Sequence, residues 1–241
     1  MTVTARVALV TGGGVRLGRA ISEGLADHGF DVAVHYHGSA AAANGTVEGL
    51  VRRGRRAVAL QGDLRDPGAC RATVERAVAE LGGLDVVVNS AASFRPTRLG
   101  ETPSQAWDEI FTLNARAPFL IVQAAAPHLR DGGAIINIAD LAALQSWPSY
   151  VAHGASKAAL VSVTRSLARA LGPRVRVNAV APGAVLLPEG YAPAAAERLV
   201  QETPLGRLGA PQDVVEAVRY LIDADFVTGT VLVVDGGRSA R

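Results

Sequence analysis

The chain has 241 residues, of which 49% are hydrophobic, and a formal net charge of +2. This is enough apolar sequence for a sizeable core, and the balanced charge gives no indication of a nucleic-acid partner. The single cysteine, Cys70, excludes an internal disulfide and provides no cysteine cluster, so we expect no metal site. No apolar run approaches the roughly 18 residues of a membrane span, and no signal-peptide core precedes the first strand. We therefore expect a soluble, cytoplasmic protein with no membrane partner.

Short β-branched segments alternate with alanine- and leucine-rich stretches along the whole chain. Nearly continuous apolar runs, typical of strands covered on both faces, occupy residues 7–10, 31–37, 57–60, 85–89, 134–139, 175–180 and 231–235. Each intervening stretch can hold a helix, so the pattern predicts an α/β fold of βαβ units with a parallel sheet. Without a linker or a shift in composition, residues 1–241 are predicted to form a single domain. Four prolines predict an irregular segment over residues 182–205.

A glycine-rich segment, "VTGGGVRLG", follows the first predicted strand and opens the first predicted helix. Gly12, Gly13, Gly14 and Gly18 remove side chains where the backbone turns and where a pyrophosphate would approach the helix N-terminus. A glycine-rich turn without a ligand is the alternative. The position between a strand and a helix in a chain of βαβ units favours dinucleotide binding.

The end of the second predicted strand, "HYHGSA", carries no carboxylate. An acidic residue there would bind the ribose 2′-hydroxyl of NAD and repel a 2′-phosphate. His37 and Ser39 offer hydrogen-bond donors, and Arg16 in the glycine loop offers a cation. Because a charge-assisted hydrogen bond contributes roughly 1.5–3 kcal/mol, these residues predict a preference for NADP(H) over NAD(H). The alternative is an ordinary polar strand end.

Residues 149–160 read "SYVAHGASKAAL", in which His153 precedes Lys157 by four residues. On a helix the two side chains share a face. Lys157 is the single lysine among 24 basic residues. An ammonium and a guanidinium are not interchangeable, so an otherwise arginine-only chain indicates a specific use for this lysine.

In their order along the chain, these motifs resemble the short-chain dehydrogenase/reductase family over nearly the whole sequence. Further matching motifs are "GDL" with Asp63, "NSAAS" from Asn89, "LNARAPF" with Asn114, "VRVNAVAPG" and "VTGTVLVVDGG". The resemblance implies a Rossmann-type doubly wound parallel sheet of about seven strands flanked by helices, with NADP(H) as cofactor. The cofactor-binding residues that it implies are Gly12, Gly14, Arg16, Leu17, Gly18, His37, Ser39, Asp63, Leu64, Asn89, Lys157, Pro182 and Gly183.

Within that family the chain most resembles the pteridine reductases. They too have an arginine in the cofactor loop, a "HYH…SA" strand end and a Ser-Phe pair, here Ser93–Phe94. Asp140 lies thirteen residues before His153, where the family has its catalytic serine and pteridine reductases have aspartate. Gly38 departs from the arginine expected beside Ser39. The substrate-contacting residues implied are Arg16, Phe94, Asp140, Trp147, Tyr150, Leu186 and Arg241.

The larger departure is His153, which stands where the family has its catalytic tyrosine. The resemblance implies that Lys157 orients the nicotinamide ribose, that Asn114 holds a water in a proton relay, and that Asp140 and His153 share the role of proton donor. A free imidazole titrates near pH 6.5 and a phenol near 10, so histidine can exchange a proton near neutrality. His153 as a lost catalytic group and Asp140 as a helix N-cap are the alternatives. Phe94, Trp147, Tyr150 and Leu186 are alternatively ordinary packing residues.

These observations predict an NADPH-dependent reductase that transfers a hydride to a pterin, a dihydrofolate or a related flat heterocycle. Two alternatives stay open: a carbonyl reductase acting on ketones such as 3-oxoacyl thioesters, and a non-catalytic NADP(H)-binding sensor or scaffold. The resemblance also implies a homotetramer in which Arg241 reaches the site of a neighbouring subunit.

Overall fold

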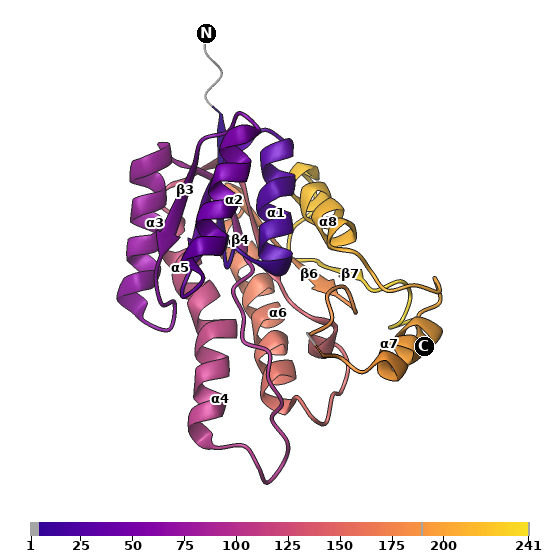
Figure 1. The fold of residues 1–241 in the computed structure, drawn as a ribbon. Coiled ribbons are helices and arrows are strands. Elements are labelled where there is room, and N and C mark those ends of the chain that lie inside the picture. Colours follow the sequence, from indigo (N-terminus) through magenta and orange to yellow (C-terminus); the bar gives the residue numbers. More distant parts are fainter. Residues whose placement is uncertain (1–4, 189, 241) are drawn as a thin grey trace.

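The structure, a computed structural model, describes residues 5–188 and 190–240 (Figure 1). Seven strands form one parallel sheet in the order β3-β2-β1-β4-β5-β6-β7. Their bounds are β1 Arg6–Thr11, β2 Phe30–Tyr36, β3 Ala57–Gln61, β4 Leu84–Asn89, β5 Leu129–Ile138, β6 Val175–Pro182 and β7 Val231–Val234. The predicted doubly wound parallel sheet is confirmed, although β5 begins earlier than its apolar run because Leu129 already pairs with Leu84.

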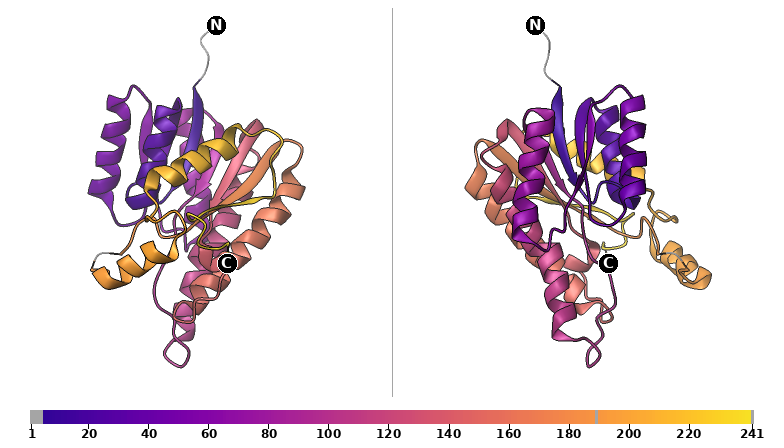
Figure 2. Two further views of the ribbon diagram at one scale, coloured as in Figure 1. Left: turned by 90° about the vertical axis from the view of Figure 1, so that its right-hand side faces the viewer. Right: turned by 60° about the vertical axis from the view of Figure 1, so that its left-hand side comes forward.

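Helices cover both faces of the sheet. They are α1 Arg16–Asp27, α2 Ala40–Arg52, α3 Pro67–Leu81, α4 Ser104–Phe111, α5 Ala117–Ala125, α6 Val151–Leu171, α7 Pro193–Glu202 and α8 Pro211–Asp223. Helices α1, α2 and α8 pack on one face, and α3, α5 and α6 pack on the other (Figure 2). Along β1, Ala8 and Val10 join the first core while Val7 and Leu9 join the second, as the alternation of side chains along a strand requires. None of the described helices is both long and apolar enough to cross a bilayer.

The prediction of irregular structure throughout residues 182–205 is wrong for Pro193–Glu202, which form α7. Proline is favoured at the first helical position, and the alanine-rich run after Pro193 has high helix propensity, so this proline begins a helix instead of breaking one. No residue of α7 is buried, and the helix stands apart from the two layers that flank the sheet (Figure 2).

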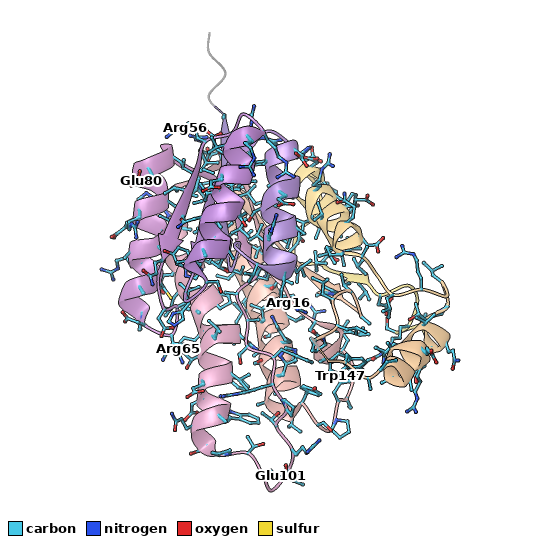
Figure 3. All side chains as sticks on the ribbon, viewed as in Figure 1. Arg16, Arg56, Arg65, Glu80, Glu101 and Trp147 are labelled. Carbon is cyan, nitrogen blue, oxygen red and sulfur yellow. The ribbon has the colours of Figure 1, made fainter. Side chains whose placement is uncertain are left out.

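The carboxyl ends of the strands lie at one end of the molecule, where the chain order reverses between β1 and β4. Ligands of open α/β sheets bind at such a switch point. Arg16 and Trp147 lie toward this end, whereas Arg56 and Glu80 lie at the opposite end (Figure 3). The predicted cofactor and substrate residues are therefore expected to gather at this end of the sheet.

Candidate active site and cofactor site

The glycine loop forms a close-packed turn between β1 and α1. Gly12 has a φ of +64°, and a Cβ added there would lie 3.0 Å from the Cα of Ala91. A Cβ at Gly18 would lie 2.1 Å from the carbonyl oxygen of Gly12. Helix α1 starts after Val15, which provides no side-chain cap for the first N–H groups. Because no side chain covers the loop or caps the helix, its free backbone N–H groups can bind a pyrophosphate.

His35 on β2 holds this loop from behind. The backbone N–H of Gly12 donates to His35 Nδ1 at 3.2 Å, and His35 Nε2 lies 3.0 Å from the carbonyl oxygen of Gly62. A carbonyl oxygen only accepts, so Nε2 carries the proton and Nδ1 is the acceptor. Burial lowers the pKa of His35 to about 4, which keeps this imidazole neutral. The "HYH" segment was interpreted through its cofactor contacts, and the structure adds a structural role for its first histidine, His35, in holding the loop.

The far end of the cofactor site, at the carboxyl end of β2, carries no free acidic charge. His37 and Ser39 are exposed there. Asp63 Oδ1 lies 3.9 Å from His37 Nδ1, and Asp63 Oδ2 accepts a hydrogen bond from Arg65 Nη2 at 2.7 Å. That hydrogen bond lowers the pKa of Asp63 to about 2 and compensates the carboxylate charge. The absence of an acidic strand end and the pairing of Asp63 both fit a 2′-phosphate.

Arg16 joins the cofactor loop to the segment before α7. It is the non-glycine residue with positive φ, +49°, in the described part of the chain. Its Nη2 donates to the carbonyl oxygens of Leu186 and Leu187 at 3.0 and 3.3 Å. The side chain therefore ties the predicted phosphate loop to the predicted substrate loop, a contact that the sequence did not predict.

The remaining predicted cofactor residues lie in or next to the carboxyl ends of the strands. Asn89 ends β4, is buried, and donates to Asn137 Oδ1 at 2.9 Å. Pro182 ends β6, and the backbone N–H of Gly183 donates to the carbonyl oxygen of Val234 at 2.9 Å. Leu64 is buried after β3, and Leu17 packs against the core from the first turn of α1.

The catalytic candidates gather around Asn114. A π-helical turn, Thr112–Arg116, interrupts the run from α4 to α5 and carries this fully buried side chain. Such turns are frequent at functional sites. Asn114 Nδ2 donates to the carbonyl oxygen of Ser93 and to Ser156 Oγ, each at 3.0 Å, while its Oδ1 accepts from the backbone N–H of Ser93 at 2.7 Å. Asn114 thereby fixes the chain after β4 against α6.

His153 lies beside this cluster in the first turn of α6 and is only 2% exposed. Its Nδ1 lies 3.1 Å from the carbonyl oxygen of Ser93 and 3.4 Å from Asn114 Nδ2. Because the two N–H groups of Asn114 donate at shorter distance to Ser93 and Ser156, we assign the proton to His153 Nδ1, as donor to Ser93. Its Nε2 points to Asp140 Oδ2 at 3.5 Å and has no hydrogen-bond partner in the described part of the chain. At 3.5 Å this contact is too long for a good hydrogen bond, and it is an ion pair only when His153 is protonated. Asp140 Oδ1 also accepts from the backbone N–H of Ala142 at 2.7 Å, so this carboxylate caps a short 3₁₀ turn as well.

Lys157 lies one turn further along α6 on the same, buried face. It is 4% exposed, and its Nζ donates to the carbonyl oxygen of Ile138 at 2.7 Å. Burial lowers the pKa of Lys157 to about 8, and the negative charge of Asp140 opposes this shift. The face shared by His153 and Lys157 is therefore a buried one and not a solvated stripe.

Aromatic side chains form one wall next to His153. Phe94, 47% exposed, stacks on Tyr150 with 4.6 Å between ring centroids and meets the His153 ring edge-on at 4.9 Å. Trp147 contacts Tyr150 at 6.3 Å between centroids. Phe94 is thus not part of the core. The predicted substrate residue Arg241 lies outside the described residues.

Sequence reasoning missed the contributions of Ser156, Arg65 and the backbone of Ser93. No residue type signals a backbone carbonyl contact, whereas Ser156 stood next to Lys157 in "SYVAHGASKAAL" and Arg65 directly follows the "GDL" motif. A separate cavity of about 370 Å³ lies between the end of β7 and the segment after α7, and its lining includes Thr203, Leu205 and Asp235 but not Asp140 or His153. The candidate active site is therefore the region around Asp140, His153 and Lys157, and this cavity is not part of it.

Comparisons with known proteins find relatives that match nearly the whole chain. A family model described as Enoyl-(Acyl carrier protein) reductase matches residues 14–239. The 3-oxoacyl-[acyl-carrier-protein] reductase FabG of Staphylococcus aureus is 33% identical over 95% of this chain and 96% of its own. A short chain dehydrogenase from Burkholderia cenocepacia, solved with NADP, has a TM-score of 0.92 and 38% identity, covering 97% of each chain. FolM alternative dihydrofolate reductase 1 from Brucella canis, also with NADP, has a TM-score of 0.93 and 34% identity, covering 99% of this chain and 96% of its own.

Proposed function

The chain belongs to the short-chain dehydrogenase/reductase family and is an NADP-dependent reductase, and we propose that it reduces a pterin, a dihydrofolate or a related flat heterocycle. The observation that carries this proposal is the carboxylate of Asp140 facing the buried imidazole of His153, with the exposed ring of Phe94 beside them. A flat ring can stack on Phe94 within reach of both acid–base groups. The similarity to a dihydrofolate reductase supports the same substrate class.

The residues of the carboxyl edge fit NADP(H). We assign the pyrophosphate to the loop at Gly12–Gly14 and the N-terminus of α1, and the 2′-phosphate to the edge formed by His37 and Ser39. Lys157 is assigned to the nicotinamide ribose. When bound, the dinucleotide supplies the hydride.

The chain itself supplies the proton. His153 Nδ1 is held by the carbonyl oxygen of Ser93, which leaves Nε2 to exchange a proton with Asp140 and with the substrate. Asp140 is 25% exposed, so solvent can replace the proton after each turnover. Asn114 acts as a positioning residue, because its amide fixes the Ser93 backbone that orients His153.

The test is the oxidation of NADPH, followed at the nicotinamide absorbance band, with dihydrobiopterin, dihydrofolate and a panel of ketones. We expect turnover with a dihydropterin or a dihydrofolate. Turnover with ketones alone contradicts the proposal and supports a carbonyl reductase, the second candidate, which the 33% identity to a 3-oxoacyl reductase favours. NADPH binding without turnover of any substrate supports the non-catalytic alternative.

We also propose that the chain acts as a cytoplasmic homotetramer. The last strand, β7, is half-buried throughout and pairs on one side with β6, and Tyr220 and Phe226 nearby are exposed. An open strand edge with exposed aromatic residues favours pairing with another copy.

Light scattering measures the molar mass of the assembly, and the mass of a monomer contradicts the proposal. Full activity after deletion of residues 239–241 contradicts a role for Arg241 in a neighbouring site.

A further inference from the structure

Asp63 brings an acidic charge to the strand ends where the 2′-phosphate is assigned. Strands β2 and β3 pair side by side as far as Tyr36 and Gln61, so the residues that follow them leave the sheet together. Oδ1 of Asp63 lies 3.9 Å from Nδ1 of His37. The lack of a carboxylate in "HYHGSA" therefore does not by itself free this edge of negative charge, because the end of β3 provides one in space.

An uncompensated carboxylate here would act against NADPH. An acidic residue at this edge is the feature that favours NAD, and a phosphate monoester carries a charge of about −1.5 to −2 near neutrality. Asp63 does not lose its charge by taking up a proton at neutral pH, because the hydrogen bond from Arg65 lowers the pKa of its carboxyl group to about 2. A neighbouring cation is therefore needed to compensate it.

Arg65 is that cation. Its Nε lies 2.9 and 3.0 Å from the two carboxylate oxygens of Asp63, its Nη2 donates to Oδ2 at 2.7 Å, and its backbone N–H donates to Oδ1 at 3.0 Å. Arg116 in the π-helical turn donates to the carbonyl oxygen of Arg65 at 2.8 Å and holds this segment from outside. Arg65 lies at the same end of the molecule as Arg16 (Figure 3).

The other expected sources of positive charge do not reach this carboxylate. Residue 38, where pteridine reductases have an arginine, is glycine, and a Cβ added there would meet no atom within 4 Å. The guanidinium of Arg16 donates to the carbonyl oxygens of Leu186 and Leu187. In the described part of the chain, Arg65 is thus the arginine within salt-bridge distance of Asp63.

We propose that Arg65 determines the preference of this reductase for NADPH over NADH by neutralising Asp63. The inference rests on the assignment of the 2′-phosphate to the edge formed by His37 and Ser39, and it holds for any substrate that the enzyme reduces. Arg65 changes the electrostatic potential that the 2′-phosphate meets. Because NADH lacks this phosphate, its affinity should depend little on the pair.

Dissociation constants of NADPH and NADH test the proposal without turnover. They are measured by nicotinamide fluorescence at low ionic strength on the wild type, Arg65→Ala, Asp63→Asn and the double variant. We expect Arg65→Ala to raise the constant for NADPH by about 5-fold, the size of an exposed charge interaction, and to leave that for NADH nearly unchanged. Adding Asp63→Asn to Arg65→Ala should restore the wild-type ratio of the two constants. The effect of Arg65→Ala should shrink in about 0.5 M salt, since exposed charges are screened.

Arg207→Ala is the matched control. Arg207 holds Asp213 through a similar two-pronged contact, with Nη1 and Nη2 each 2.8 Å from a carboxylate oxygen. The control therefore removes the same charge and frees one carboxylate outside the assigned cofactor site, and it should leave the ratio unchanged. Comparing ratios also cancels any loss of an adenine contact in Asp63→Asn, since both cofactors share the adenine.

Three outcomes overturn the proposal. The first is an unchanged ratio in Arg65→Ala. The second is an equal loss of affinity for both cofactors, which would restrict Arg65 to the shape of the turn. The third is a loss of NADPH affinity that Asp63→Asn does not restore, because Arg65 would then bind the phosphate itself. Reduction of a dihydropterin or a dihydrofolate is measured separately, so the proposed function stands or fails independently of these outcomes.

Discussion

The imidazole of His35 accepts a hydrogen bond from the backbone N–H of Gly12 and donates one to the carbonyl oxygen of Gly62, at 3.2 and 3.0 Å. One buried side chain thus connects the cofactor loop to the end of β3. The contact with Gly12 requires the neutral ring, because a protonated Nδ1 cannot accept from an N–H group, whereas Nε2 donates to Gly62 in either protonation state.

Stability is therefore expected to fall in mild acid. Burial lowers the pKa of His35 from 6.5 to about 4, so the unfolded chain takes up a proton before the folded chain does. The contribution of the neutral ring is complete above pH 6.5 and is lost as the pH falls toward 4, by up to about 3 kcal/mol at about 1.4 kcal/mol per pH unit. Urea unfolding between pH 7.5 and 4.5 measures this loss. His35→Gln should flatten the profile in this range, whereas the exposed control His128→Gln should not. A wild-type profile that matches that of His35→Gln contradicts the prediction.

The affinity for NADPH is expected to fall as the pH rises through about 8. Lys157 loses its proton there, since burial lowers the pKa of this ammonium to that value. Loss of a charge-assisted hydrogen bond to the ribose should weaken binding by about 10- to 100-fold. Dissociation constants from NADPH fluorescence between pH 6.5 and 9.5 check this.

Two substitutions at Lys157 serve as controls. Lys157→Met should bind weakly at every pH, and Lys157→Arg should bind weakly without the pH dependence, because a guanidinium stays charged but does not fit a site with 4% exposure. If Lys157→Met retains wild-type affinity and pH dependence, the lysine does not contact the cofactor.

Arg16→Ala is expected to weaken NADPH binding more than NADH binding and to loosen the segment before α7. The guanidinium is the predicted cation for the extra phosphate, and it also holds the carbonyl oxygens of Leu186 and Leu187. The ratio of dissociation constants reports the first effect, and hydrogen exchange at Leu186 and Leu187 reports the second. Arg19→Ala is the matched control, because Arg19 pairs with Glu23 within the same helix. An unchanged cofactor ratio with faster exchange would restrict Arg16 to the loop contact.

The fold could be predicted from sequence because the central strands are covered on both faces and are nearly continuous apolar runs, as in "VALV" of β1 and "AIINI" of β5. Helix α7 was missed because Pro193, one of several prolines in this segment, was taken to interrupt a helix. At the first position of a helix, proline is favoured.

The residues Asp140, His153 and Lys157 of the site could be predicted from their spacing in the sequence. The approach of His153 to Ser93 could not be, since it depends on a backbone carbonyl that only the tertiary structure brings there. The contact of Arg16 with Leu186 joins segments far apart in the sequence and has no local signal.

The last prediction concerns His153, which stands where the family has tyrosine. His153→Ala should lower the rate of pterin reduction by about 10²- to 10⁴-fold, the usual share of general acid catalysis, and leave the NADPH dissociation constant nearly unchanged. His153→Tyr should restore activity relative to Ala and extend it to higher pH, because a free phenol titrates near 10 and a free imidazole near 6.5. That extension ends near pH 8, where Lys157 loses its proton. Rates of pterin reduction measured from pH 5.5 to 9.5 on the wild type, His153→Ala and His153→Tyr check this prediction.

Wild-type turnover by His153→Ala would mean that Asp140 supplies the proton through water and that the imidazole is passive. Activity confined to His153→Tyr would mean that this chain has lost the family's chemistry and binds NADPH without reducing a substrate.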